Sequence, residues 1–330
     1  MPYSEIAVTG IGNAIVDILS QAEEEFVIRQ GFAKGSMSLI EAERALALTQ
    51  HLNDPLHTSG GSAANTIAGL AMLGSRAGYI GKVGQDALGQ KFELAMRSLG
   101  VVFPTKPSDS GCPTAHCVVL VTPDAQRTMC THLGACVELG PEDIDIELVQ
   151  SSQVTYLEGY LWDPPRAREA FHVAAQAAHA AKRQVSLSLS DSFCVDRYRD
   201  SFREFVKHHV DVLFANESEL TSLYQTHDVS VALQQAKDDC RIVAVTCGAA
   251  GCLIGSAGQV LEVPAEPVKS VVDTTGAGDL FAAGFLHGHS TGRSIRECAV
   301  IGGIAAAEVI SHFGARPERS LRETVQARFS

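Results

Sequence analysis

Residues 273–284 read DTTGAGDLFAAG, a stretch whose residue types and spacing could handle a phosphate group. Gly276 and Gly278 flank Ala277 directly before an apolar run, and the free N–H groups at the start of a helix there would form an anion site. Asp279 follows in the first turn of that helix. Amides can stabilise charge on a phosphoryl group in transit while a carboxylate takes the proton of a hydroxyl. The stretch therefore suits phosphoryl transfer to a hydroxyl.

A second interpretation of the same stretch stays open. An isolated Asp at a helix start commonly compensates the helix dipole, and nearby glycines commonly form a tight turn. The combination of a glycine-rich cradle with a carboxylate one residue later favours the catalytic interpretation of Asp279.

Other ligand-binding motifs are missing from the sequence. The dinucleotide fingerprint needs a third glycine after Gly10 and Gly12, but that position holds Ile15. No G-x-x-x-x-G-K-[ST] sequence occurs, which excludes a P-loop. His287 and His289 stand two residues apart in a predicted helix, so they do not share a face and are not expected to bind a metal.

The composition predicts a cytoplasmic globular protein. Its 330 residues are enough for one large or two ordinary domains. A net charge of −12 without a basic cluster argues against nucleic acid or an anionic membrane as partner. The nine cysteines include no C-x-x-C pair, which predicts reduced thiols rather than a disulfide frame or zinc site. The N-terminus lacks the pattern of a signal peptide, and the sequence leaves a homodimer open.

Predicted strands and helices alternate along most of the chain. The strands are expected at 5–11, 76–84, 154–161, 184–190, 210–216, 241–248, 251–256 and 259–265. The helices are expected at 61–74, 86–100, from 164 onward, near 196–208, from 217, at 277–289 and at 294–312. This order indicates an α/β fold with a mostly parallel sheet flanked by helices. Such folds bind ligands beyond the carboxyl ends of their strands.

Two segments, roughly 14–50 and 101–135, break this alternation. The second contains Pro, Gly and alternating β-type residues, so we expect strands outside the main sheet that form a small β lid. Because no linker-like tract occurs, we expect one domain over residues 1–330 with inserted lid segments.

Two stretches resemble the signatures of a known family. DTTGAGD resembles the C-terminal signature of the ribokinase (PfkB) family of carbohydrate and nucleoside kinases. SGGSAANTIAGLAMLGSRAGYIGKVGQDALGQKF, residues 59–92, is similar to the family's N-terminal signature, and the resemblance covers essentially the whole chain. It implies a ribokinase-like fold and a kinase that uses ATP and Mg²⁺.

The resemblance also implies roles for single residues. Asp279 would be the catalytic base, and the amides of Gly276, Ala277 and Gly278 would form the anion hole. The residues implied to bind the acceptor are Asn13, Asp17, Gly60, Gly61 and Asn65. Asp can accept from a vicinal diol, and glycine lets backbone approach a small polar ligand. Without the resemblance, Asn13 and Asp17 could equally form a satisfied turn after the first strand.

Further elements of the family lie on the nucleotide side. ANESE resembles the N-x-x-E element, so Asn216 and Glu219 would act near Mg²⁺ and its waters; alone they indicate a capping box. Thr246, Gly248 and Gly251 resemble a nucleotide-binding turn, although a plain hairpin connection would have the same residues. The candidates for a monovalent cation such as K⁺ are Asp273, Thr275 and Ser311.

Within the family, the stretches GNAIVDI, FANESEL and CAVIGGIAAAEVISHFGARP are more similar to adenosine kinases than to ribokinase. Residues 126–135 resemble the arginine-bearing lid stretch there, which makes Arg127 a candidate phosphate clamp. The candidates for contact with a flat base are Met37, Leu133, Tyr160 and Phe193, which could also simply fill core. The expected reaction is transfer of the ATP γ-phosphate to the 5′-hydroxyl of adenosine, a step of purine salvage. A kinase for free ribose or fructose is the alternative, and a non-catalytic ligand-binding relative is a third.

Overall fold

The computed structural model describes residues 3–124 and 126–329, and its centre is an eight-stranded sheet in the order β13-β12-β11-β10-β9-β8-β1-β5. The strands from β5 to β11 are parallel, and β12 and β13 extend the sheet as antiparallel strands. The bounds are β1 Ile6–Ile11, β5 Ala77–Ile80, β8 Ser152–Glu158, β9 Gln184–Ser188, β10 Val212–Asn216, β11 Ile242–Thr246, β12 Cys252–Ser256 and β13 Gln259–Val263.

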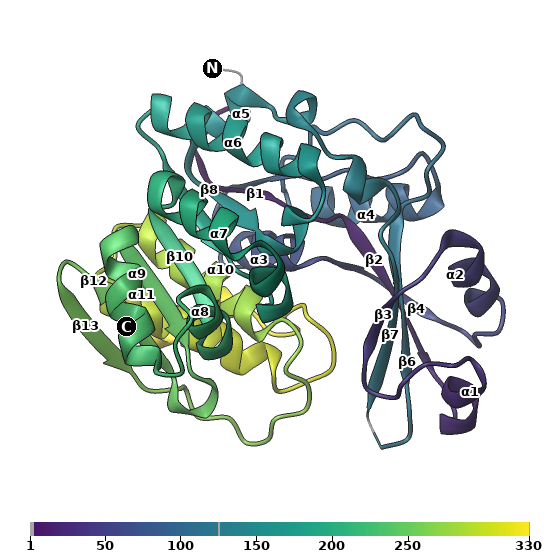
Figure 1. The fold of residues 1–330 in the computed structure, drawn as a ribbon. Helices are drawn as coiled ribbons and strands as arrows, with labels where there is room; N and C mark the ends of the chain where they lie inside the picture. Colours follow the sequence, from purple (N-terminus) through teal and green to yellow (C-terminus); the bar gives the residue numbers. More distant parts are fainter. Residues whose placement is uncertain (1–2, 125, 330) are drawn as a thin grey trace.

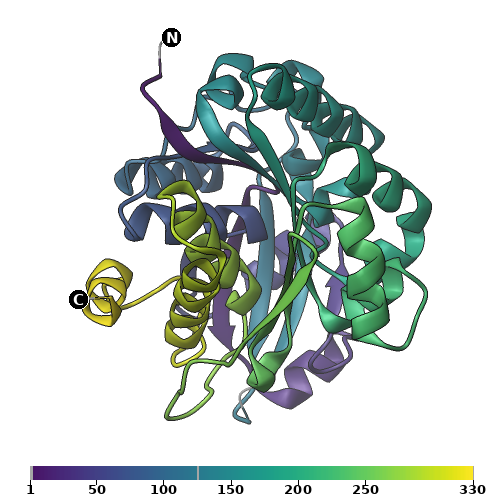
Figure 2. The same cartoon turned by 90° about the vertical axis from the view of Figure 1, so that its left-hand side faces the viewer.

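Helices cover both faces of this sheet (Figure 2). One face carries α3 Ser62–Met72, α4 Ala87–Ser98, α10 Ala277–Ser290, α11 Ile295–Val309 and α12 Leu321–Arg328. The other carries α5 Ile146–Ser151, α6 Pro165–Ala180, α7 Ser192–His209, α8 Glu217–Leu223 and α9 Val229–Asp239. Short 3-10 turns lie at η1 Gly134–Glu138, η2 Pro141–Asp143, η3 Gly159–Trp162 and η4 Gly248–Ala250. Phe214 joins the first core and Leu213 the second, since side chains along a strand alternate between faces.

A second sheet of five strands, ordered β3-β7-β6-β2-β4, lies to the right of the main sheet in Figure 1. Its bounds are β2 Ile15–Gln21, β3 Met37–Leu39, β4 Leu56–Gly60, β6 Ala115–Val121 and β7 Arg127–His132. The helices beside it are α1 Glu24–Arg29 and α2 Ala42–Thr49. A small core joins them, in which Val27 and Leu48 pack with Val118 and Leu120.

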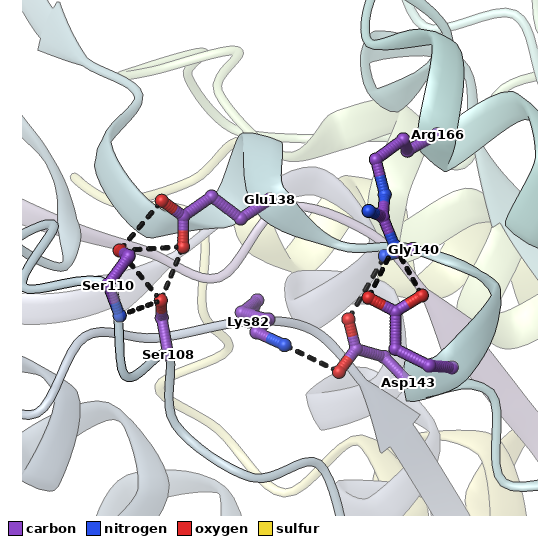
Figure 3. A network of polar contacts seen from close by, with 8 residues as sticks. Lys82, Ser108, Ser110, Glu138, Gly140, Asp143 and Arg166 are labelled. Atoms are coloured by element: carbon purple, nitrogen blue, oxygen red, sulfur yellow. Dashed lines mark hydrogen bonds and ion pairs between the residues drawn. The ribbon is translucent and has the colours of Figure 1, made fainter.

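The segment that returns from β7 to the main body is fixed by two groups of polar contacts (Figure 3). Glu138 accepts hydrogen bonds from the hydroxyls of Ser108 and Ser110, the latter at 2.8 Å. Lys82 Nζ lies 2.6 Å from Asp143 Oδ1, and both side chains are largely shielded from water. These contacts tie the loop before β6 and the turns after β7 to the main body.

The predicted fold class is confirmed, and each predicted strand of the main sheet is present. The prediction left out α1 and α2 beside the second sheet and, in the main body, α5, α9 and α12. The buried contacts of α9 and α12 are few: Ala232, Leu233 and Ala236 in α9, and Leu321 and Val325 in α12. The helix predicted at 294–312 ends at Val309, so the following residues are free to turn back toward α3. All nine cysteines are free thiols, and no described helix has the length and hydrophobicity of a transmembrane span.

The crossing of α10 and α11 generates a test of packing. An ideal Cβ on Gly284 would lie 2.5 Å from the carbonyl oxygen of Ile301, which is backbone and cannot rotate away. We expect Gly284→Ala to lower the free energy of unfolding by about 1–3 kcal/mol, as overpacking does. The matched control is Gly303→Ala in α11, where the nearest atom is Glu266 Cγ at 3.5 Å. Urea unfolding should show the control unchanged or slightly stabilised; equal losses in both variants would contradict the packing argument.

Candidate active site

The site begins where α3 and α10 approach each other closely. An ideal Cβ on Gly69 of α3 would lie 2.6 Å from Leu280 Cδ1 and 2.9 Å from Ala283 Cβ of α10. Only a glycine therefore permits this helix spacing without displacement of the neighbours. Asn65 stands one turn before Gly69, so the same approach places its amide beside the first turn of α10.

The carboxylate of Asp279 is held by two donors from α3. Ser62 Oγ donates to Oδ1 at 2.6 Å, and Asn65 Nδ2 donates to Oδ2 at 3.0 Å. Both oxygens therefore contact the neighbouring helix, and neither is used to cap α10 itself. Burial raises the pKa of Asp279 from 3.8 to about 6, while the two hydrogen bonds and the charge of Arg316 act in the opposite direction.

The turn before α10 has the geometry of an anion cradle. Gly276 is the N-cap and has a left-handed φ of 80°, and an ideal Cβ there would collide with Ala315 at 2.9 Å. The first N–H groups of a helix have no intrahelical acceptor. The amide of Ala277 donates to the carbonyl of Thr274 at 3.2 Å. At Gly278, an ideal Cβ would meet no atom within 4 Å, so the space beside this residue is open. The predicted anion-hole residues thus lie beside Asp279 at one helix start.

Arg127, the first residue of β7, reaches this turn from the second sheet. Its Nη2 lies 2.5 Å from Asp273 Oδ2, and its Nη1 donates to Thr275 Oγ1 at 3.2 Å. The guanidinium also lies 5.5 Å from the ring centroid of Phe313. Asp273 in turn accepts from the hydroxyl of Thr275 at 2.7 Å and from the amide of Gly314 at 2.9 Å. An arginine from the second sheet therefore contacts the segment directly before α10.

A buried carboxylate, Glu158, joins the first strand to the start of α3. It accepts from Asn13 Nδ2 at 2.7 Å, from the Asn13 amide at 3.3 Å and from the Ala63 amide at 2.8 Å. Its exposed fraction is 1%. Burial raises the pKa of Glu158 to about 7, against the lowering effect of these hydrogen bonds. Glu158 thus fixes Asn13 at the point where the chain passes from β1 to β2.

The predicted acceptor residues come together at the same place. An ideal Cβ on Gly60 would lie 2.7 Å from Asp17 Cγ, and one on Gly61 would collide with the carbonyl oxygen of Asn13. Gly61 also has a φ of 91°, which L side chains rarely adopt. Burial raises the pKa of Asp17 to about 7, and the charges of Arg316 and Arg127 lower it. The structure therefore brings Asn13, Asp17, Gly60 and Gly61 to one side of Asp279.

The predicted nucleotide-side residues lie at the carboxyl ends of β10 and β11. Asn216 and Glu219 form a complete capping box, with Asn216 Nδ2 donating to Glu219 Oε1 at 2.6 Å. Burial raises the pKa of Glu219 to about 7, and the charges of Asp191 and Asp279 add to this. The β11–β12 connection is a hairpin turn, in which Gly251 has a φ of 98° and leaves no room for a Cβ. Thr246 ends β11, and Gly248 begins the 3-10 turn.

The remaining predicted residues differ in exposure. Met37, Tyr160 and Phe193 are exposed by 54%, 41% and 77%, and Leu133 is partly buried. Burial and the charges of Asp191 and Asp279 raise the pKa of the Tyr160 hydroxyl. The Ser311 hydroxyl donates to the carbonyl of Glu308 at 2.7 Å. The base-contact and monovalent-cation roles stay predictions, and the described residues contain no group of three or more His, Cys, Asp or Glu placed to hold a metal ion.

Three residues at the site carried no role in the sequence analysis: Ser62, Glu158 and Arg316. Ser62 lies inside the SGGSAAN motif, so its position directly after two glycines was a usable signal. Glu158 is the acidic residue at the carboxyl end of an otherwise apolar strand, where α/β proteins bind ligands. Arg316 lies between α11 and α12, at the end of the stretch CAVIGGIAAAEVISHFGARP, whose similarity to adenosine kinases pointed to no single residue there.

This arrangement can deprotonate a hydroxyl beside an anion cradle, which is the chemistry of a phosphotransferase with an alcohol acceptor. Residues 36–321 match the pfkB family of carbohydrate kinases, and the chain belongs to this family. It is accordingly an ATP-using phosphotransferase of the ribokinase-like fold.

Known proteins similar to the chain include two solved structures. Adenosine kinase from Sinorhizobium meliloti is 48% identical, covers 98% of this chain and 100% of its own, and has a TM-score of 0.91. A probable sugar kinase protein from Rhizobium etli CFN 42 is 47% identical, covers 99% of both chains and has a TM-score of 0.91. Adenosine kinase from Dictyostelium discoideum is 29% identical over 94% of this chain and 96% of its own length.

The two interpretations of Asp279 predict different outcomes for Asp279→Asn. The new amide group can face Ser62 Oγ, which can accept, while the remaining oxygen accepts from Asn65, so the shape is kept. Loss of a general base should lower turnover by about 10²–10⁴-fold while ATP and acceptor still bind. A helix-start role alone would leave turnover near normal. Turnover and melting temperature measured side by side decide between the two.

The pH dependence of kcat/KM follows from the same carboxylate. Asp279 accepts a proton only when it is ionised, so activity should fall as the pH drops through about 6. The pKa values of Asp17 and Glu158 are about 7, so protonation of these two carboxylates should extend the acid limb to higher pH. Ser62→Ala removes a hydrogen bond that lowers the pKa of Asp279, so it should move the limb to higher pH. Thr66→Val is the matched control, because the Thr66 hydroxyl contacts the backbone carbonyls of Ser62 and Asp279 and the Tyr156 hydroxyl rather than the Asp279 carboxylate. A limb that Ser62→Ala leaves in place would contradict this role.

Proposed function

We propose that this protein transfers the γ-phosphoryl group of ATP to the 5′-hydroxyl of adenosine, giving AMP. The observation that carries the proposal is the 48% identity with an adenosine kinase over nearly the full length of both chains. The geometry of Asp279 between Ser62 and Asn65 supports the proposal, because this carboxylate would serve as the base that the reaction needs. The nine free thiols suit a reducing compartment, so we place the reaction in the cytoplasm.

In the proposed mechanism the acceptor hydroxyl lies against Asp279, which takes its proton as the phosphoryl group arrives. Asp17 and Asn13 would hold the ribose hydroxyls, at the edge where Gly60 and Gly61 let backbone come close. The amides of Gly276, Ala277 and Gly278, together with Arg127, would stabilise the charge on the phosphoryl group. Because Ser62 and Asn65 fix both oxygens of Asp279, the base needs no rearrangement before it acts.

The polar groups around the nucleotide side suit Mg-ATP. The charges of Asp191 and Asp279 raise the pKa of Glu219, and a divalent cation would relieve that repulsion. When bound, Mg²⁺ neutralises phosphate charge. We propose that Glu219 and Asn216 act near it through water, since their side-chain groups already bond each other. Thr246, Gly248 and Gly251 would contact the nucleotide at the end of β11. Asp273, Thr275 and Ser311 are our candidates for a monovalent cation.

We further propose that the second sheet closes over the acceptor as a lid. The predicted lid segments, 14–50 and 101–135, contain β2, β3, β6 and β7, and β4 completes the sheet from outside both segments. A cavity of about 1070 Å³ borders this sheet, lined in part by Leu19, Arg127 and Phe313. Closure would exclude water that could otherwise accept the phosphoryl group.

Adenosine and free sugars are distinguished by a direct turnover comparison. We expect ATP consumption with adenosine to exceed that with ribose or fructose, measured as ADP formed per enzyme with AMP identified as product. The 47% identity with a probable sugar kinase protein makes the sugars the necessary comparison. High turnover on ribose or fructose with none on adenosine would contradict the nucleoside part of the proposal. ATP and adenosine binding without any turnover would indicate a non-catalytic relative.

Arg127→Ala tests the proposed lid. The substitution removes the ion pair with Asp273 and the phosphate clamp, so turnover should fall and ATP hydrolysis should rise relative to phosphoryl transfer. Arg29→Ala is a matched control, because Arg29 borders the same cavity from α1, away from the α10 turn. Hydrogen exchange of residues 115–132 should slow when adenosine saturates the wild-type protein. Unchanged protection there would count against closure.

A further inference from the structure

Arg316 lies in the segment that follows α11, and its side chain reaches Asn65 of α3. Its Nε donates to Asn65 Oδ1 at 2.9 Å, and Asn65 Nδ2 donates to Asp279 Oδ2 at 3.0 Å. A continuous chain of donors therefore runs from the guanidinium to the carboxylate that we propose as the base. Arg316 lies outside both family signatures and carries no role in the proposed mechanism.

The Asn65 amide has two ends of similar shape and opposite hydrogen-bonding character. With the amide reversed, its NH₂ group would face the Nε–H of Arg316, and its oxygen would face the carboxylate of Asp279. Both contacts would be repulsive, because donor would meet donor and acceptor would meet acceptor. We propose that Arg316 is a positioning residue that fixes the orientation of Asn65 and thereby keeps a donor on Asp279. This inference rests on the proposed role of Asp279 as the base.

The charges around the site make a cation at this position consequential. The groups that interact electrostatically with Asp279 include Tyr156 and Glu158 of β8, Tyr160 of η3, Glu219 of α8 and Arg316. Those that interact with Arg316 are Asp17 of β2, Tyr79 of β5 and Asp279. Except for Arg316, each of these groups is neutral or negative. The guanidinium therefore opposes the burial that raises the pKa of Asp279 and of Asp17.

The guanidinium also contacts a second helix. Its Nη2 lies 3.9 Å from Met96 Sδ in α4, so the planar group is confined between α3 and α4. A lysine would keep a positive charge, but its single ammonium lacks the planar donor set that reaches Asn65 in this orientation. Lys should thus restore the electrostatic part of the effect and not the orientation of Asn65.

A purely structural role of Arg316 can be separated from this one. Glu308 accepts from the amides of Glu318 and Arg319 at 3.1 Å and 2.9 Å, and the Gly314 amide donates to Asp273. These backbone contacts hold the segment on both sides of Arg316. Removal of the Arg316 side chain should therefore leave the path of the chain in place.

The experiment compares Arg316→Met and Arg316→Lys with Arg319→Met, a control whose exposed side chain lies three residues further on. Arg316→Met should move the acid limb of kcat up by about one pH unit. At pH values well below the acid limb, this shift corresponds to about a tenfold lower kcat, and the difference from the wild type should shrink at pH 9. Arg316→Lys should shift the limb less than Arg316→Met, because it keeps the positive charge and loses only the contact with Asn65. Arg319→Met should have the wild-type profile and melting temperature.

A double-mutant cycle tests whether Arg316 acts through Asn65. If it does, Arg316→Met should lower kcat much less in an Asn65→Leu background than in the wild type. Losses that multiply, or a loss for Arg316→Met that is equal at all pH values with a lower melting temperature, would overturn the inference.

A readout independent of turnover separates this inference from the proposed function. The pKa of the Asp279 carboxyl, followed by ¹³C NMR and assigned with Asp279→Asn, should rise in Arg316→Met. An unchanged pKa overturns the inference whatever the enzyme phosphorylates. Wild-type protein that is inactive on adenosine contradicts the proposed function instead, and leaves the NMR comparison to decide the role of Arg316.

Discussion

The placement of the Asp279 carboxylate depends on how closely α3 approaches α10 at Gly69. Any larger residue there would collide with Leu280 and Ala283 and push the two helices apart. Hydrogen bonds tolerate only a small increase in length, so this separation would break the contacts between α3 and Asp279. The hydrogen bonds from Ser62 and Asn65 exist because the helices are this close. Each hydrogen bond to a charged group is worth about 1.5–3 kcal/mol. Because these bonds form only when the helices are close together, helix packing and the polar contacts stabilise the geometry of Asp279 jointly.

That closeness has an electrostatic consequence. Asp17, Glu158 and Asp279 come from β2, β8 and α10, and all three have pKa values raised by burial. Such carboxylates are tolerated only where each has donors, since an unpaired buried charge is strongly destabilising. Asn13 and Ala63 donate hydrogen bonds to Glu158. Ser62 and Asn65 donate to Asp279. The positive charge of Arg316 interacts with Asp17 and Asp279. The site is thus an acidic cluster whose counter-groups come from three separate parts of the chain: the turn after β1, helix α3 and the segment after α11.

The sequence predicted those features that are determined by neighbouring residues. The main-sheet strands follow from local apolar runs, and the turn at Gly276 follows from a stretch in which only glycine adopts the left-handed conformation. The contacts of Glu158 and Arg316 could not be predicted in the same way, because 145 residues separate Asn13 from Glu158 and 251 separate Asn65 from Arg316. α9 was missed because its buried residues are Ala232, Leu233 and Ala236, and two alanines with one leucine give only a weak helical pattern of hydrophobic residues. For Asn216 and Glu219, the structure shows the capping box that the sequence indicated, and that local role does not exclude another.

The two sheets are joined by four passages of the chain, before β2, after β4, before β6 and after β7. Asn13 is held by Glu158 at the first, and Gly61 abuts the Asn13 carbonyl at the second. At the other two, the Ala135 amide donates to the Pro113 carbonyl at 2.8 Å. A rotation of the second sheet must therefore bend all four passages together. Because Arg127 belongs to β7, any such rotation would also move its guanidinium relative to Asp273 and the start of α10.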